Sequence, residues 1–239
     1  MRKVLATIGM ILTIVLLIVI AIACQGGIVG NGRVETRTED IGKFTRLAVN
    51  GNFNIILEQS KKPSLRLEMD ENLLEITKVT EDGNTLRIET KINILQAREK
   101  NLFIGVQDLE KLDLGGAIKL TADSTLRFES LGILASGAVR LDFAIEGRQL
   151  NLDLAGASEC DLRGKVDELR VQLSGAGDFD AFDLITRDAE IDLSGAGSAR
   201  VYATEKLDVS ISGAGSVKYR GEPELHKNIS GLGSLRRDK

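Results

Sequence analysis

The residues of this chain that could do chemistry are mainly acidic. One set recurs at the same place in a repeated phrase and comprises Asp113, Asp153 and Asp192. A second set lies close together in the sequence and comprises Asp178, Asp180 and Asp183. Two carboxyl groups held about 5–10 Å apart can act as acid and base on a glycosidic bond. These residues therefore raise the hypothesis of a polysaccharide-active enzyme.

The surroundings of these acids argue against catalysis. Asp153 and Asp192 are separated by a repeat that carries Gln172 at the same place. No histidine, arginine pair or aromatic platform for a sugar accompanies them in the sequence. Solvated strand faces ordinarily carry acidic residues. We therefore predict that the protein is not an enzyme and has no catalytic residues.

Other reactive residue types are scarce. Cys160 falls in an apolar column and away from His226, the only histidine, so we predict a buried core thiol. The sequence has no Cys/His cluster for zinc and no phosphate-binding loop motif. The repeat period is about twice that of the nine-residue calcium-binding phrase, to which Gly177-Asp178 is the one near match. We predict no cofactor and no metal.

The acids and the cysteine must be positioned by a repeat that organises most of the chain. The phrase reads LDLGGA, LASGAV, LDLAGA, VQLSGA, IDLSGA, VSISGA and NISGLG, and its shared glycine returns every 18 to 21 residues. Centring FTRLAVNGNFNIILEQS (44–60) on its glycine recovers the same pattern earlier in the chain. We predict that these glycines form tight structural corners: Gly51, Gly116, Gly137, Gly156, Gly175, Gly195, Gly213 and Gly231.

Apolar and polar residues alternate on both sides of each shared glycine. Positions two and four before it and four and six after it are mostly apolar, whereas odd positions are mostly polar. A period of two is typical of a strand with one solvated face. Each repeat is too short to bury its apolar edge alone and must stack on its neighbours. The sequence therefore predicts an all-β fold, a single-stranded right-handed parallel β-helix (β-solenoid) with about 18–21 residues per turn.

This β-helix is expected to span residues 40–235, followed by a polar tail (236–239). The interval between Gly51 and Gly116 would hold about three more turns of the same length. Within it, SLRLEMD (64–70) and NTLRIET (84–90) read as strands, with a turn at 81–84. Residues 73–77 fit either a strand or a short helical turn, and residues 91–101 fit a loop or one or two helical turns.

Residues 1–23 are predicted to be a hydrophobic targeting helix that acts as a signal peptide or membrane anchor, and residues 24–39 a glycine-rich tether. The run ends Ala21-Ile22-Ala23-Cys24, which resembles the lipobox of bacterial lipoproteins and implies lipidation of Cys24. The apolar run 4–23 is also long enough to cross a bilayer uncleaved. Either the Cys24 lipid or residues 4–23 would hold the body at the extracytoplasmic face of a bacterial membrane, in the cell envelope.

The charge balance narrows the choice of partners. The formal net charge is −4, and the basic residues form no cluster in the sequence. Nucleic-acid-binding domains ordinarily carry a basic patch. We therefore predict that nucleic acid is not a partner.

The order of the motifs resembles a known family. FTRLAVNGNFNIILEQS, then DGNTLRIET, then VQDLEKLDLGGA and the repeated SGAG phrases are similar to the putative auto-transporter adhesin head GIN domain family. The resemblance covers residues 40–235 and implies an extracytoplasmic right-handed β-helix on a membrane- or lipid-anchored protein, with no catalytic residues. We expect a non-catalytic module with an adhesive or structural role in the envelope, whose partner is a glycan or a protein. The alternatives are a self-assembling envelope scaffold, which would be a homo-oligomer, and a polysaccharide-active enzyme.

Overall fold

A computed structural model describes residues 26–238, so residues 1–23 and Cys24 lie outside the described part. The described chain is mostly β-structure, in one largely parallel sheet of 13 strands and one sheet of two strands. Up to residue 106 the elements are β1 (Ile28–Val29), β2 (Val34–Glu39), β3 (Arg46–Gln59), β4 (Ser64–Asp70), α2 (Glu71–Ile76), β5 (Thr77–Asp82), β6 (Thr85–Thr90), β7 (Ile94–Gln96) and β8 (Lys100–Val106). After them come β9 (Lys111–Ala122), β10 (Leu126–Gly175), β11 (Asp178–Gly195), β12 (Ser198–Gly213), β13 (Ser216–Arg220), β14 (Glu224–Gly231) and β15 (Ser234–Arg237). Among residues 26–238, no helix is long and apolar enough to cross a membrane.

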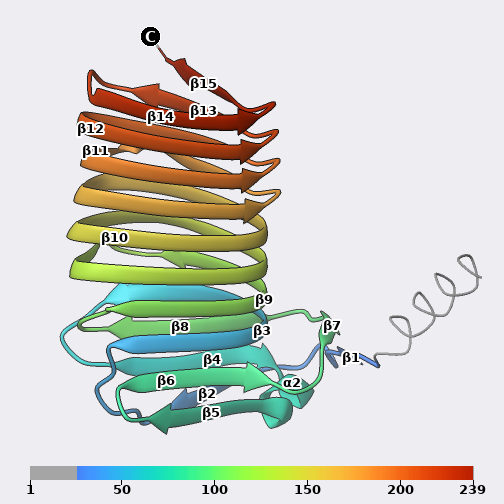
Figure 1. Cartoon of the computed structure of the whole chain (residues 1–239). Helices are drawn as coiled ribbons and strands as arrows, with labels where there is room; N and C mark the ends of the chain where they lie inside the picture. The colour runs from blue at the N-terminus through green and yellow to red at the C-terminus, as the bar shows by residue number, and fades with distance from the viewer. Residues whose placement is uncertain (1–25, 239) are drawn as a thin grey trace, which may run out of the picture.

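The repeats from β9 to β15 stack on one another through parallel pairing. Figure 1 shows the ribbon passing back over itself from the green to the red part of the chain. The shared glycines are in register across the pairs: Gly116 pairs with Gly137, and Gly195 pairs with Gly175 on one side and Gly213 on the other. A large, largely parallel sheet therefore positions every side chain of the repeats.

The core lies between the two sides of this stack. Up to the last repeat, positions two before the shared glycine are buried, as at Leu114 and Leu154, and so are positions four after it, as at Leu120 and Phe179. In the last repeat Ile229 is exposed and Leu235 is partly buried. The alternation predicted from the sequence is thus confirmed. Because the interior is filled by aliphatic side chains, the polar residues between them must lie on the outer face of the strands.

A second glycine, two residues after the shared one, decides whether the strand continues. Where that position holds a larger residue, as Ile118 and Val139 do, β9 and β10 run on without a break. Where it holds glycine, as at Gly177 and Gly197, the strand ends at the shared glycine and the next strand begins three residues later. The backbone hydrogen bonds persist across the break, since the Ser198 amide donates to the Gly177 carbonyl at 2.9 Å.

The interval between Gly51 and Gly116 does not hold three further turns, and that prediction was wrong. Gly51 pairs directly with Gly116, so β3 and β9 are neighbours in the stack. The residues between β3 and β9 pair with the edge of β3 that faces away from β9. There β6 pairs with the first half of β3 and β8 pairs with its second half. Strands β2, β4 and β5 then add antiparallel partners. We call β2, β4, β5, β6 and β8 the antiparallel cap, after the antiparallel pairs that join them to one another. This cap closes the end of the stack, because the chain here reverses in turns instead of adding parallel repeats.

Other parts of the sequence-based division also differ from the structure. Residues 34–39, expected in the tether, form β2 against β4, and residues 28–29 pair with β7. Arg236 and Arg237, expected in the polar tail, belong to β15 and pair with β13. Residues 34–39 and 236–237 are mostly polar, but their backbone groups pair with an otherwise open strand edge. Residues 71–76 form the helix α2, and residues 94–96 form β7.

Candidate functional site

The acids three residues before the shared glycines do not form a catalytic pair. Asp113 pairs in register with Leu134, and Asp192 pairs with Gln172. Non-acidic layers therefore separate Asp113, Asp153 and Asp192 from one another, at about 4.8 Å per layer. Their side chains lie on the outer face, and the carboxylates are held apart by two strand spacings.

Cys160 lies in the core, as predicted. It is buried and has Phe179 as its register neighbour on β11. Burial raises the pKa of the Cys160 thiol far above its ordinary range, and the negative charge of Asp161 adds to that increase. His226 lies elsewhere, with Nδ1 3.1 Å from the Asp208 carboxylate. A protonated, enclosed thiol without a base is inert as a nucleophile.

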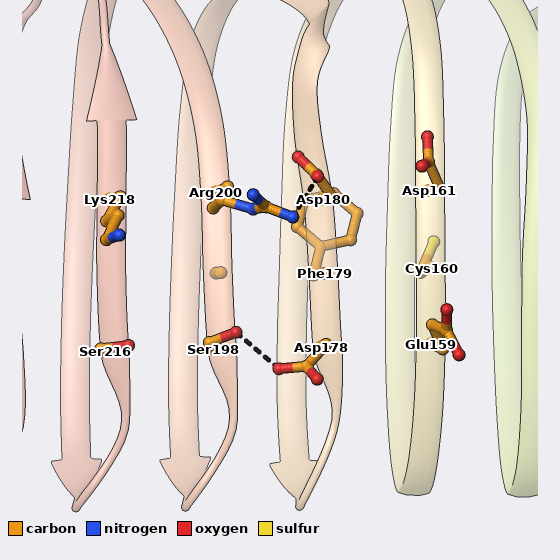
Figure 2. Close-up of a pocket in the computed structure, with 11 residues that line it drawn as sticks. Glu159, Cys160, Asp161, Asp178, Phe179, Asp180, Ser198, Arg200, Ser216 and Lys218 are labelled. Atoms are coloured by element: carbon orange, nitrogen blue, oxygen red, sulfur yellow. Dashed lines mark hydrogen bonds and ion pairs between the residues drawn. The ribbon is translucent and has the colours of Figure 1, made fainter. Parts of the chain in front are cut away.

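The side chains that do gather are on the outer face just after the shared glycines. A shallow groove of about 390 Å³ crosses four repeats there and is lined by acidic, basic and hydroxyl side chains. Figure 2 shows these side chains rising from adjacent parallel strands, in two rows. The row three residues after the glycine contains Glu159, Asp178, Ser198 and Ser216. The row five residues after contains Asp161, Asp180, Arg200 and Lys218.

The second row continues beyond the groove and forms what we call the charge column. Strand pairing places Asp161 beside Asp180, Asp180 beside Arg200, and Arg200 beside Lys218. Arg236 pairs with Lys218 at one end, and Asp142 takes the same place in the preceding repeat at the other. The charge column therefore consists of three acids followed by three bases: Asp142, Asp161, Asp180, Arg200, Lys218 and Arg236.

Some members of the charge column have partners within the chain. Asp142 accepts a hydrogen bond from Arg163 at 2.6 Å, and Asp180 forms an ion pair with Arg200. Asp178, in the adjacent row, accepts a hydrogen bond from the Ser198 hydroxyl at 2.5 Å (Figure 2). Asp183 lies in register with Arg163. Of the three acids predicted to cluster, Asp178 and Asp180 lie in the groove, and Asp183 lies beside it.

Asp161 is the exception. Within residues 26–238 it has no hydrogen bond or ion pair, although it lies between Asp142 and Asp180. Asp161 is exposed, yet partial desolvation by its neighbours raises its pKa; the negative charges of Asp180 and Asp142 raise it further, and Arg163 opposes them. Lys218 and Arg236 likewise have no ion pair in the described chain. The centre of each half of the charge column therefore carries charge that the chain does not neutralise.

On another face of the stack, neighbouring repeats carry charges of opposite sign that form ion pairs. There, acids and bases alternate between neighbouring repeats, so that Arg127 pairs with Glu146 at 3.1 Å and Arg170 pairs with Glu190 at 2.9 Å. Arg148 pairs with Glu129 at 2.6 Å. Like charges opposite each other on neighbouring strands are destabilising. The charge column thus differs from these alternating acid–base pairs.

The groove is poorly suited to hydrolysis. Asp161 and Asp180 lie on adjacent strands, about 4.8 Å apart, which is near the separation of a glycosidase pair. However, Asp180 is held by Arg200, and Phe179 points into the core rather than offering a surface for a sugar. No group of three or more acids, histidines or cysteines in the described chain could hold a metal ion. The groove therefore presents an open row of acidic, basic and hydroxyl side chains.

Sequence reasoning missed the charge column. It followed the position three before the shared glycine, where the acids are more numerous. Reading the position five after the glycine gives the letters D, D, D, R, K and R in successive repeats. The change of sign halfway along was the available signal.

Comparison with known proteins places the fold and the family. The chain resembles the crystal structure of a putative adhesin from Bacteroides fragilis (TM-score 0.82, 23% identity, covering 89% of this chain and 100% of that one). It also resembles a putative lipid binding protein from Parabacteroides distasonis (TM-score 0.71, 27% identity, 90% and 100% covered). A third likeness is to a putative adhesin from Parabacteroides merdae (TM-score 0.63, 21% identity, 89% and 99% covered). No curated protein matches the chain.

The family model described as "Putative auto-transporter adhesin, head GIN domain" matches residues 43–223. This range contains β3, the strands β4 to β8, and the stacked repeats as far as β13. The chain belongs to the putative auto-transporter adhesin, head GIN domain family.

Proposed function

We propose that this protein is a non-catalytic adhesion module that stands on the extracytoplasmic face of a bacterial membrane. Its body is a single-stranded right-handed β-solenoid, which presents long flat faces to a glycan or protein partner. The observation that carries the proposal is the stacking of in-register parallel repeats from β9 to β15 around an aliphatic core. Such a body offers surface rather than an enclosed site.

The arrangement of carboxylates supports a role without catalysis. Asp113, Asp153 and Asp192 are separated by intervening layers, and Asp180 is neutralised by Arg200. Acid–base catalysis by two carboxyl groups uses environments that push their pKa values apart. The membership in a family described as adhesins agrees with this interpretation.

The anchor belongs to the part of the chain outside residues 26–238. We propose that residues 1–23 direct export and that Cys24 is lipidated, with a single-pass anchor through residues 4–23 as the alternative. Both attach the body near β1, beside the antiparallel cap. The stack would then extend away from that cap, with β15 at the far end.

Adhesion and anchoring are tested together in a non-adherent bacterial host that produces the full chain. Radioactive palmitate should label the wild type and not Cys24→Ala, whereas a single-pass anchor would leave both unlabelled in the membrane fraction. Cells with the wild type should be retained on an immobilised glycan array or on a surface coated with the same cells, above the level of vector-only cells. Retention equal to the vector would refute adhesion, and release of new reducing sugar ends from the array would refute a non-catalytic role.

A further inference from the structure

The charge column changes sign at its midpoint, between Asp180 and Arg200. Three acids lie on one side and three bases on the other, at one residue per layer. When a second copy of such a row is rotated by 180° so that its order is reversed, each acid faces a base of the first copy. Two-fold symmetric interfaces require that property, because the same patch must meet itself. We infer that the charge column is a docking face for a second copy of this chain, in antiparallel orientation.

The symmetry operation fixes which residues meet. A two-fold axis that runs along the strands, between β11 and β12, reverses the stacking direction and keeps the strand direction. It places Asp180 opposite Arg200 of the second copy and Asp161 opposite Lys218 of the second copy. Asp142 then faces Arg236 of the second copy. Each of the three facing pairs occurs twice, and every pair joins opposite charges.

The residues left unpaired in one copy are the ones that this docking pairs. Within the described chain Asp161 lies between two other acids, and Lys218 lies between Arg200 and Arg236. Each is exposed on the outer face. The two residues are three layers apart in one copy, about 14 Å, which exceeds the screening length of about 8 Å at physiological salt. They can therefore neutralise each other only between copies.

The neighbouring row fits the same operation. It carries the acceptors Glu159 and Asp178 on the acidic side and the hydroxyl donors Ser198 and Ser216 on the basic side. The axis sets Asp178 opposite Ser198 of the second copy, and Glu159 opposite Ser216 of the second copy. The four central residues of this row are therefore complementary about the same axis as the charge column, whereas Arg140, which pairs with Glu159 in the same chain, lies outside the match.

The size of the face sets the strength of the contact. Six layers at about 4.8 Å and five residues at about 3.3 Å give a flat patch of roughly 470 Å² per copy. A standard specific interface buries about 800 Å² per partner. A single pair is therefore weak, and its effect depends on many copies acting together.

The antiparallel orientation of the docked pair determines where the anchored ends of the two copies lie. The described chain begins at β1, beside the antiparallel cap, and β15 lies at the other end of the stack (Figure 1). In the docked pair the two caps therefore lie at opposite ends. This extension rests on the proposed anchoring near β1: copies anchored at their cap ends pair when they stand on two facing cells. The partner of the adhesion module is then the same protein on a neighbouring cell.

Charge reversal tests the docking face. The variants are Lys218→Glu, which sets acid against acid, and Asp161→Lys, which sets base against base. In the mixture of the two variants every facing pair is again acid against base. Lys165→Glu is the control, because Lys165 is an exposed lysine that lines a different groove, with Arg127 and Glu146. Circular dichroism of each variant checks that the fold is kept.

The first measurement is the oligomeric state of the full chain in detergent, by light scattering and sedimentation at increasing concentration. The wild type and Lys165→Glu should form dimers that dissociate as the salt concentration rises. Each reversal alone should weaken the dimer at least about tenfold, since like charges then face each other, and mixing the two should restore it. A monomeric wild type, unchanged dimers in the single variants, or a mixture that fails to recover would each overturn the docking face.

The second measurement is clumping of cells that carry the full chain. Wild-type cells should clump, cells with either reversal alone should not, and a mixed population of the two should clump with the variants alternating in each contact. Dimers in detergent without clumping of wild-type cells would overturn pairing between cells while supporting the docking face. Retention on a glycan array without dimers would overturn the docking face while supporting the adhesion proposal.

Discussion

Replacing Gly156 with alanine should lower the melting temperature of the stack strongly. Gly156 has a φ of +94°, a backbone conformation that residues with a side chain rarely adopt. A Cβ added there would lie 2.6 Å from the carbonyl oxygen of Gly137 in the preceding repeat, and 3.2 Å from its nitrogen. These are backbone atoms of a paired strand, so they cannot rotate away as a side chain would.

The size of the effect follows from two costs. A positive φ costs a residue with a Cβ about 1–2 kcal/mol. Forcing an atom into a packed contact costs about 1–3 kcal/mol more. Their sum is roughly 2–5 kcal/mol, and each kcal/mol lowers the melting temperature of a domain of 150–250 residues by about 2–4 °C. We expect a fall on the order of 10 °C, measured by far-UV circular dichroism of the full chain in detergent.

Two other glycines separate the two costs. Gly83 has a φ of +56° but no atom within 4 Å of an added Cβ, so Gly83→Ala carries the conformational cost alone. Gly132 has no positive φ, and its added Cβ would lie 3.8 Å from the Glu110 carbonyl, an ordinary contact. The expected order of melting temperatures is Gly132→Ala highest, then Gly83→Ala, then Gly156→Ala. Equal melting of Gly156→Ala and Gly132→Ala would refute the argument that the stacked glycines exclude a side chain.

Three further changes test other parts of the fold. Cys160 should resist iodoacetamide in the native protein and react once the protein is unfolded, because its thiol is buried and protonated; rapid native labelling would contradict that placement. Asp70→Ala should destabilise the protein by about 2–4 kcal/mol, since it removes a buried carboxylate that accepts hydrogen bonds from three backbone amides. Burial raises the pKa of Asp70, but these hydrogen bonds lower it more, so its pKa in the folded protein lies below its ordinary value. The stability that the Asp70 carboxylate contributes is therefore present above the ordinary pKa and is lost as the pH falls through the lowered pKa of the folded state. A difference in unfolding free energy between the wild type and Asp70→Asn that grows in acid would refute this sign. Ser158→Ala should leave stability unchanged or raise it by up to about 1 kcal/mol, because the buried Ser158 hydroxyl has no partner within residues 26–238; a clear loss on chemical denaturation would mean that the hydroxyl is satisfied.

The stacked repeats could be predicted because one repeated sequence pattern determines both which residues are buried and which residues pair. Alternation with a period of two identified the buried columns, so residues such as Leu154 and Phe179 were correctly placed in the core. The shared glycine gave the register, since its neighbours along the stack are again glycines. Where each repeat contacts only the next, local pattern and long-range contact carry the same information.

The antiparallel cap could not be predicted in the same way. Its strands pair with β3 at positions that no periodicity relates, such as Arg46 with Thr85 and Asn54 with Asn101. Counting residues suggested three more turns, because length alone cannot distinguish stacked turns from hairpins. The turn signal at 81–84 was correctly interpreted, and β5 and β6 do pair as antiparallel neighbours around it. What the sequence lacked was the partner of each strand.

The candidate site was missed for a different reason. Each charge in the column is ordinary for a solvated strand, and the unusual feature is the order of signs across six repeats. That order becomes visible only when the position five after the glycine is read down the stack, from Asp142 to Arg236. The acids that attracted attention first, Asp113 and Asp153, are separated by the layer of Leu134.

The direct contact between Gly51 and Gly116 has a consequence for how the protein is made. All the strands that cap this end lie before β9 in the chain, so they emerge before the stacked repeats, both from the ribosome and in an export that starts at the amino terminus. Each later repeat then finds the edge of the one before it already in place, some twenty residues behind. Synthesis from the amino terminus therefore supplies a template for every strand at the moment when it is needed. The folded stack therefore grows at one end only. The strand edge that is unpaired at any time is the one with which the next repeat will pair.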